Sequence, residues 1–179
     1  ANLLKELACS DEFKRATRNK IDSKRMLDCE FVNRFLAFYL LGTKKYSGNL
    51  EDYLNDVMIQ LQKESKCTIE KCRIDFLKAM KYAACIFEDK AFRKITANGR
   101  YGMINKPLYD SITVNLAKLS TQDCERLLKK KDKVMEKYIH LLKNKEFASI
   151  ITSGTAAIDH VKDRHSEICK LFQEVLEDD

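Results

Sequence analysis

Apolar side chains spaced at helical intervals between Arg25 and Leu41 are the feature that most constrains the fold. Two rows carry this pattern: Phe31, Phe35 and Phe38, and Val32, Leu36 and Tyr39. The rows follow the period of an α-helix and make a stripe so wide that we expect neighbours on more than one side. Asp28 is the predicted N-cap, because its carboxylate can accept from first-turn amides. Glu30 and Arg34 stand four residues apart and are predicted to pair on this helix.

Few turn-forming residues accompany this helix, because the 179 residues include only 5 Gly and 1 Pro. That scarcity argues against a sandwich or barrel of many short strands. Helical periodicity recurs in the segments 2–17, 50–61, 68–87, 105–119, 121–143 and 153–176. Residues 88–104 are predicted to be a short helical piece followed by an irregular loop. Residues 146–151 are predicted to be a short helix, with a strand as the alternative. The sequence therefore predicts an all-α, bundle-like single domain over residues 1–179, with about seven to eight helices.

Seven cysteines stand at positions 9, 29, 67, 72, 85, 124 and 169, and none belongs to a C-x-x-C pair. A zinc site would need closer pairs with histidine nearby. His160 and His165 are five residues apart, a step that does not share a helix face. We interpret the cysteines as free thiols of a reducing cytoplasm, and we expect neither a metal nor a cofactor.

The sequence shows no targeting or membrane signal. No apolar run approaches the ~20 residues that cross a bilayer, and the N-terminus has no signal-peptide core. We therefore expect a cytoplasmic protein without a membrane partner. The chain begins as though cut from a longer one, and a homo-oligomer stays open.

The net charge of +6 is unevenly distributed. Six bases and one acid lie between Phe13 and Leu27, and five bases and no acid lie between Lys90 and Tyr109. If these segments share a face, they could follow a phosphate backbone. The candidate nucleic-acid contacts are Lys14, Arg15, Arg18, Lys20, Arg93, Lys94 and Arg100. The lysines between Leu127 and Lys137 are interpreted as a solvated helix face. If the chain is a scaffold, its acidic C-terminal end could neutralise its basic face.

Catalytic patterns are missing from the sequence. It contains no Gly-x-Ser-x-Gly elbow, and Ser153-Gly154-Thr155 lacks the spacing and lysine of a phosphate-binding loop. We interpret this tripeptide as a helix cap. A stand-alone enzyme that uses His160 and Asp163 is the remote alternative, and we predict a non-catalytic chain.

Several separated motifs nevertheless resemble one family. They are Asn2-Leu3-Leu4-Lys5-Glu6-Leu7-Ala8; Arg25-x-x-Asp28-x-Glu30-x-x-x-Arg34-Phe35-x-Ala37-Phe38; Tyr46-x-Gly48-x-Leu50-x-x-Tyr53-Leu54-Asn55; Ala91-Phe92-Arg93; Asn105; and Phe147-x-x-x-Ile151-x-x-Gly154-Thr155, with Val161 and Arg164 beyond. Together they span essentially the whole chain and resemble the C-terminal helical half of GmrSD-type proteins. In that family a ParB/sulfiredoxin-like domain precedes the helical half.

The resemblance implies NTP-dependent restriction of modified foreign DNA and phage defence. The family's nucleotide-using motif lies in the N-terminal domain, and its nuclease activity lies in an HNH-type module, so no catalytic residue carries over. The positions that carry over are Arg25, Asp28, Glu30, Arg34, Gly154, Thr155 and Arg164, which we expect to act as paired structural charges and a helix cap, or else at a domain interface. Two functions therefore stay open: a helical domain that supports the family's N-terminal domain and contacts DNA, or a protein-interaction scaffold without nucleic-acid binding.

Overall fold

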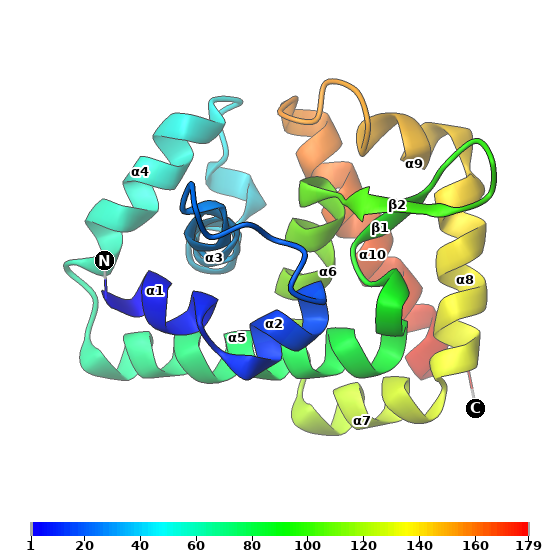
Figure 1. The fold of residues 1–179 in the computed structure, drawn as a ribbon, viewed down its shortest axis with the longest axis horizontal. Helices are drawn as coiled ribbons and strands as arrows, with labels where there is room; N and C mark the ends of the chain where they lie inside the picture. The colour runs from blue at the N-terminus through cyan, green and yellow to red at the C-terminus, as the bar shows by residue number, and fades with distance from the viewer. Residues whose placement is uncertain (1, 179) are drawn as a thin grey trace.

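The computed structural model describes residues 2–178, and within them one small hairpin lies at the edge of a helical fold (Figure 1). The α-helices are α1 (Asn2–Ala8), α2 (Asp11–Thr17), α3 (Leu27–Leu40), α4 (Leu50–Leu61), α5 (Lys66–Phe87), α6 (Lys106–Lys118), α7 (Thr121–Lys129), α8 (Lys131–Lys143), α9 (Lys145–Ile150) and α10 (Ile158–Glu177). The other elements are the 3₁₀ turns η1 (Thr43–Lys45) and η2 (Glu88–Lys90) and the strands β1 (Arg93–Ile95) and β2 (Tyr101–Ile104). The all-α prediction is confirmed, with the hairpin as an addition.

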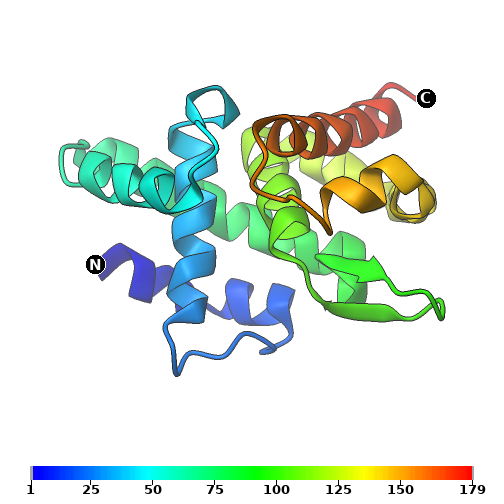
Figure 2. The ribbon, with the colours of Figure 1, turned by 90° about the horizontal axis from the view of Figure 1, so that it is seen from above.

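Helix α3 lies at the centre of one half of the fold, as its wide stripe predicted. Val32, Phe35, Leu36 and Phe38 have no exposed surface. Helices α1, α4 and α6 all pack against α3, so it is covered from several sides. Figure 2 shows α3 crossing the long helix α5, which runs beneath both halves of the molecule. Helix α6 joins the part of the fold around α3 to the part around α10, because it packs on α3, α5 and α10.

Two predicted helices are each broken into a pair. Residues 2–17 form α1 and α2, because the Ser10 hydroxyl accepts from the Phe13 amide at 3.3 Å and starts a new helix. Residues 121–143 form α7 and α8, because Lys130 takes φ −101° and ψ 25°, outside the helical region. Helix α7 then packs on α5 and α10, and α8 turns upward beside α10 (Figure 1).

Two local predictions around the hairpin and α3 are wrong. Arg93–Ile95 and Tyr101–Ile104 form antiparallel strands in place of the expected helical piece and irregular loop, and only the residues between them, around Asn98-Gly99, are a turn. The turn uses Gly99 at φ 76°, and the Thr96 amide donates to the Arg100 carbonyl at 2.7 Å. Asp28 does not cap α3, since the helix begins one residue earlier, at Leu27, and Met26 precedes it at φ 54° without a side-chain cap bond. The Asp28 carboxylate accepts instead from the Cys29 amide at 2.7 Å.

Other helix starts follow the sequence signals. Asn49, Asn105 and Ser120 accept from first-turn amides of α4, α6 and α7. The short apolar segment after Lys143 is the helix α9 rather than a strand. Over residues 2–178, no helix is both long and apolar enough to cross a membrane.

Candidate functional site

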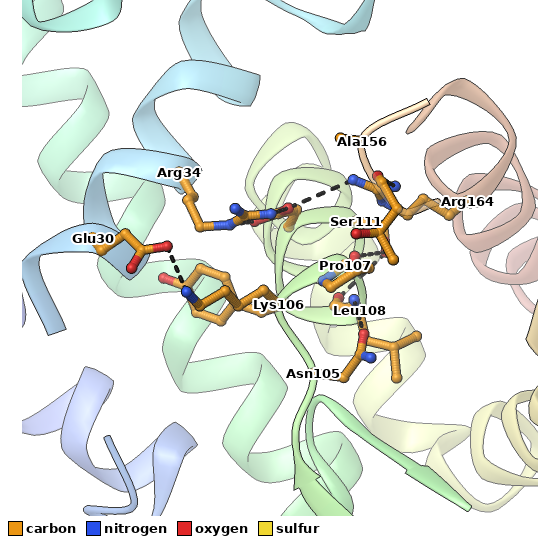
Figure 3. Close-up of polar contacts among 12 residues, drawn as sticks. Glu30, Arg34, Asn105, Lys106, Pro107, Leu108, Ser111, Ala156 and Arg164 are labelled. Carbon is orange, nitrogen blue, oxygen red and sulfur yellow. Dashed lines mark hydrogen bonds and ion pairs between the residues drawn. The ribbon is translucent and has the colours of Figure 1, made fainter. Parts of the chain in front are cut away.

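A buried ionic cluster joins α3, α6 and α10. Arg34 on α3 donates two hydrogen bonds to Asp110 on α6, from Nε to Oδ1 at 2.9 Å and from Nη2 to Oδ2. The Arg164 side chain of α10 reaches the same carboxylate from the other side, with Nη2 3.8 Å from Oδ2 (Figure 3). All three side chains are at least 95% buried, so two guanidinium groups share one carboxylate away from water.

The two arginines differ in how well they are partnered. Burial lowers the pKa of Arg34, but the Asp110 charge and hydrogen bonds outweigh burial and raise it. Burial lowers the pKa of Arg164, and the more distant Asp110 offsets this only in part while Arg34 repels it. Arg164 Nη1 donates to the Thr155 carbonyl at 2.6 Å, and its Nε has no partner among residues 2–178. Arg164 is therefore the under-compensated charge of the cluster.

A second ion pair joins α3 and α6 nearer to solvent. Lys106 at the start of α6 donates to Glu30 on α3 at 2.7 Å, with both side chains more than one-third exposed. The predicted pair between Glu30 and Arg34 is therefore wrong. Glu30 pairs with Lys106 and Arg34 pairs with Asp110, because these two residues of α6 face α3 across the helix interface.

A cleft of about 460 Å³ opens beside these charges. Its lining includes Glu30, Arg34, Lys94, Asn105, Lys106 and Arg164, together with Thr152, Thr155 and Ala156 of the α9–α10 loop. Two bonds fix this loop: Asn105 Nδ2 donates to the Ile151 carbonyl at 2.8 Å, and Tyr46 Oη donates to the Ala156 carbonyl at 2.8 Å. Asn105 also caps α6 through its Oδ1, so one side chain orients both walls of the cleft.

Four of the seven positions that the resemblance carries over line this cleft: Glu30, Arg34, Thr155 and Arg164. Gly154 and Thr155 do not cap α10, which begins later, at Ile158 with Ala157 as the N-cap residue. Gly154 forms a turn at φ 57° with the His160 ring beside it, and Thr155 offers its carbonyl to Arg164. Arg25 is exposed, and Asp28 bonds locally, so neither joins the cluster.

Sequence reasoning missed Asp110 and Lys106. Asp110 stands between Tyr109 and Ser111 in a helix whose other faces are buried as well. A carboxylate in a helix that is buried on all its faces requires a buried cation nearby. On this basis Asp110 could have been predicted to pair with Arg34.

The bases proposed to bind nucleic acid come from two segments on one side of the molecule. Figure 2 shows α2, the loop after it and the hairpin along the same edge. Lys14, Arg15, Arg18, Lys20 and Arg100 are exposed, whereas Arg93 and Lys94 are half-buried. Arg93 donates to the Gly102 carbonyl across the hairpin at 2.9 Å, and Lys94 lines the cleft. None of the five exposed bases has a side-chain ion pair within residues 2–178, and Arg93 links the two strands of the hairpin.

The lysines of α8 have acidic partners within the chain. Lys133 pairs with Asp178 at 2.6 Å, and Lys137 pairs with Glu174 at 2.7 Å. Lys131 pairs with Glu88 at 2.9 Å. The acidic C-terminal end therefore neutralises much of this helix, in contrast to the exposed bases of α2 and the hairpin.

The histidines of α10 lie apart from one another. His165 is buried against the Phe38 ring, with the ring centroids 5.0 Å apart. His160 points to the loop, with Nδ1 3.2 Å from the Ser153 carbonyl. Within residues 2–178, no three His, Cys, Asp or Glu side chains are grouped as a metal site.

Comparison with known proteins does not identify this chain, since no family model, curated protein or solved structure matches it. The resemblance to GmrSD-type proteins therefore stays a prediction.

Proposed function

We propose that this chain is a non-catalytic helical domain that binds DNA through the exposed bases of α2, the following loop and the hairpin turn. In this proposal it belongs to a GmrSD-type restriction and phage-defence protein and supports the nucleotide-using ParB/sulfiredoxin-like domain. The observation that carries the DNA contact is the common side of these segments (Figure 2). Exposed lysines and arginines gathered on one side are the electrostatic footprint of a phosphate backbone.

The separation of paired from unpaired bases supports this choice of surface. The α8 lysines have carboxylate partners within the chain, so binding DNA there would require those ion pairs to break. Arg15, Arg18, Lys20 and Arg100 are exposed, with no side-chain ion pair within the described residues. Phosphates can neutralise these four charges and release counterions.

Fluorescence anisotropy with labelled duplex DNA across a salt series tests the proposal. Log affinity should fall linearly with log salt, by about 0.9 for each phosphate neutralised. The variant Arg18→Gln/Lys20→Gln/Arg100→Gln should bind more weakly with a shallower slope. The matched variant Lys131→Gln/Lys133→Gln/Lys137→Gln removes equal charge from α8 and should leave the slope nearly unchanged. Equal effects of the two variants, or no binding at low salt, would contradict this surface.

Purified chain should neither hydrolyse nucleotides nor cut DNA if it is non-catalytic. Activity that is lost on replacing His160 or Asp163 with Ala would overturn that part of the proposal. The assay therefore covers the enzyme alternative directly.

A protein-interaction scaffold is the second candidate, favoured by two exposed methionines. Met103 on β2 is 87% exposed, and Met26 before α3 is 58% exposed. Exposed apolar side chains are common singly, but methionines suit adaptable protein contacts. If these two side chains bind the ParB/sulfiredoxin-like domain, Met26→Asp/Met103→Asp should abolish association of the two separately purified parts. Association that survives both substitutions would remove this candidate.

A further inference from the structure

We propose that the cleft between α6, β1 and the α9–α10 loop binds a phosphate group, held by Lys94, Lys106 and Arg164. This site is distinct from the proposed DNA surface, because the exposed bases of α2 and the hairpin turn do not line the cleft. Its ligand class is a phosphate monoester or inorganic phosphate.

The first argument is the charge balance of the cleft. Four cationic side chains line or underlie it, namely Arg34, Lys94, Lys106 and Arg164, whereas Asp110 and Glu30 supply two carboxylates. Asp110 is engaged by the Arg34 fork, and Glu30 by Lys106. An excess of buried or half-buried positive charge favours an anion, since isolated charges are costly away from water.

The second argument is the unsatisfied donor on Arg164. Its Nε is buried and has no acceptor within the described part of the chain, and the side chain, which is 98% buried, lines the cleft. Buried polar groups are nearly always hydrogen-bonded, and a charged donor without an acceptor is the costly exception. A phosphate oxygen is a suitable acceptor, because guanidinium donors match phosphate geometry.

The third argument is the orientation of α6. Its first residue, Lys106, and its N-cap Asn105 both line the cleft, so the positive end of this 13-residue helix faces the same space. Helix N-termini favour phosphate groups, and here that field adds to the charges of Lys94 and Arg164. Figure 3 shows Lys106, Asn105 and Arg164 around this region.

The test follows inorganic phosphate binding to the full chain by NMR, at ionic strength matched with chloride. The amides of residues 104–106 and the Arg164 Nε–H signal should shift and saturate. Lys94→Gln/Lys106→Gln should weaken binding by about tenfold, since each lysine supplies a charge-assisted contact. Lys90→Gln/Lys129→Gln, with equal charge removed outside the cleft, should bind phosphate like the unmodified chain.

Two results would overturn the proposal. One is the absence of saturable shifts at any phosphate concentration under matched ionic strength. The other is equal loss of affinity in the two lysine variants, which would mean a diffuse charge effect. Arg164→Lys keeps the charge but removes Nε–H and should abolish the phosphate-induced rise in melting temperature. If that variant does not fold, the lysine pair still decides the outcome.

Further measurements distinguish the possible sources of the phosphate group and separate the phosphate site from the DNA surface. Mononucleotide binding tighter than inorganic phosphate would indicate a nucleotide, whereas preference for a 5′-phosphorylated over a 5′-hydroxyl oligonucleotide would indicate a strand end. Arg18→Gln/Lys20→Gln/Arg100→Gln should lose duplex binding while its phosphate-induced shifts persist. Failure of the phosphate site therefore leaves the DNA surface intact, and the reverse also holds.

Discussion

Arg34 and Asp110 are 76 residues apart in sequence and form a two-bond ion pair that joins α3 to α6 in the core. Arg164 on α10 contacts the same carboxylate. The three helices therefore meet at one charge cluster rather than at an apolar contact. Such a cluster fixes which faces of the helices meet, because a shift of one helix would leave a buried charge without its partner.

Asp110→Asn should destabilise the protein strongly. It keeps the side-chain volume but leaves the buried Arg34 and Arg164 without a counter-charge, which costs about 3–5 kcal/mol. The free energy of unfolding in urea measures this loss. Glu30→Gln is the matched control, because it breaks the half-exposed pair with Lys106 and should cost at most about 1 kcal/mol. Equal costs for the two variants would mean that the cluster does not stabilise the fold.

The apolar periodicity of α3 predicted its burial correctly, because a wide stripe needs cover whatever the topology. The same sequence predicted the wrong partner for Arg34. Spacing along one helix reveals Glu30, four residues away, but it contains no information about Asp110, which only the fold brings near. Arg34 pairs with Asp110 rather than with Glu30, since the buried ion pair with Asp110 is stronger than an exposed contact on α3.

The hairpin was missed for a different reason. Strands of three and four residues are too short to show an alternating pattern. Asn98-Gly99 was itself a hairpin signal that could have been used. At the candidate site, the resemblance indicated Glu30, Arg34 and Arg164 as paired charges, but Asp110 and Lys106 carry no motif and became visible only when α6 was placed between α3 and α10.

Tyr53→Phe should cost about 1 kcal/mol, although it changes one atom. The Tyr53 hydroxyl lies 3.0 Å from the Ala37 carbonyl and 2.9 Å from the Gly42 carbonyl, so it ties the end of α3 to α4. Thermal or urea unfolding measures the change. Tyr101→Phe is the control, since no hydrogen bond of its hydroxyl is found in the described part of the chain, and it should stay within about 0.5 kcal/mol of the parent. A Tyr53→Phe value as small as the control would show that the hydroxyl is dispensable.

Thiol labelling should divide the cysteines by burial. Cys9 and Cys67 are exposed and should react quickly with a thiol reagent in native buffer. Cys72 and Cys124 have no exposed surface, and burial raises the pKa of each thiol to about 11. Because the thiolate is the reactive form, these two should react only after denaturation, as mass spectrometry of the labelled peptides would show. Native labelling of Cys124 as fast as Cys67 would contradict the packing of α7 beneath α5.

His165 should make the protein less stable as the pH falls below neutrality. Burial, together with the nearby Arg164, Lys118 and Arg34 charges, lowers its pKa from 6.5 to about 3. Between these two pKa values the unfolded chain binds a proton that the native protein refuses, so the free energy of unfolding decreases with falling pH.

The loss amounts to about 1.4 kcal/mol per pH unit well below pH 6.5, or about 2 kcal/mol by pH 5. Urea unfolding at pH 7 and pH 5 measures it while most carboxylates stay ionised. His165→Leu should remove this part of the pH dependence, because no proton can then bind at that position in either state. His140→Leu changes an exposed histidine and should retain the parent's pH dependence. If both variants kept the same dependence, the destabilisation at low pH would arise from groups other than the buried imidazole.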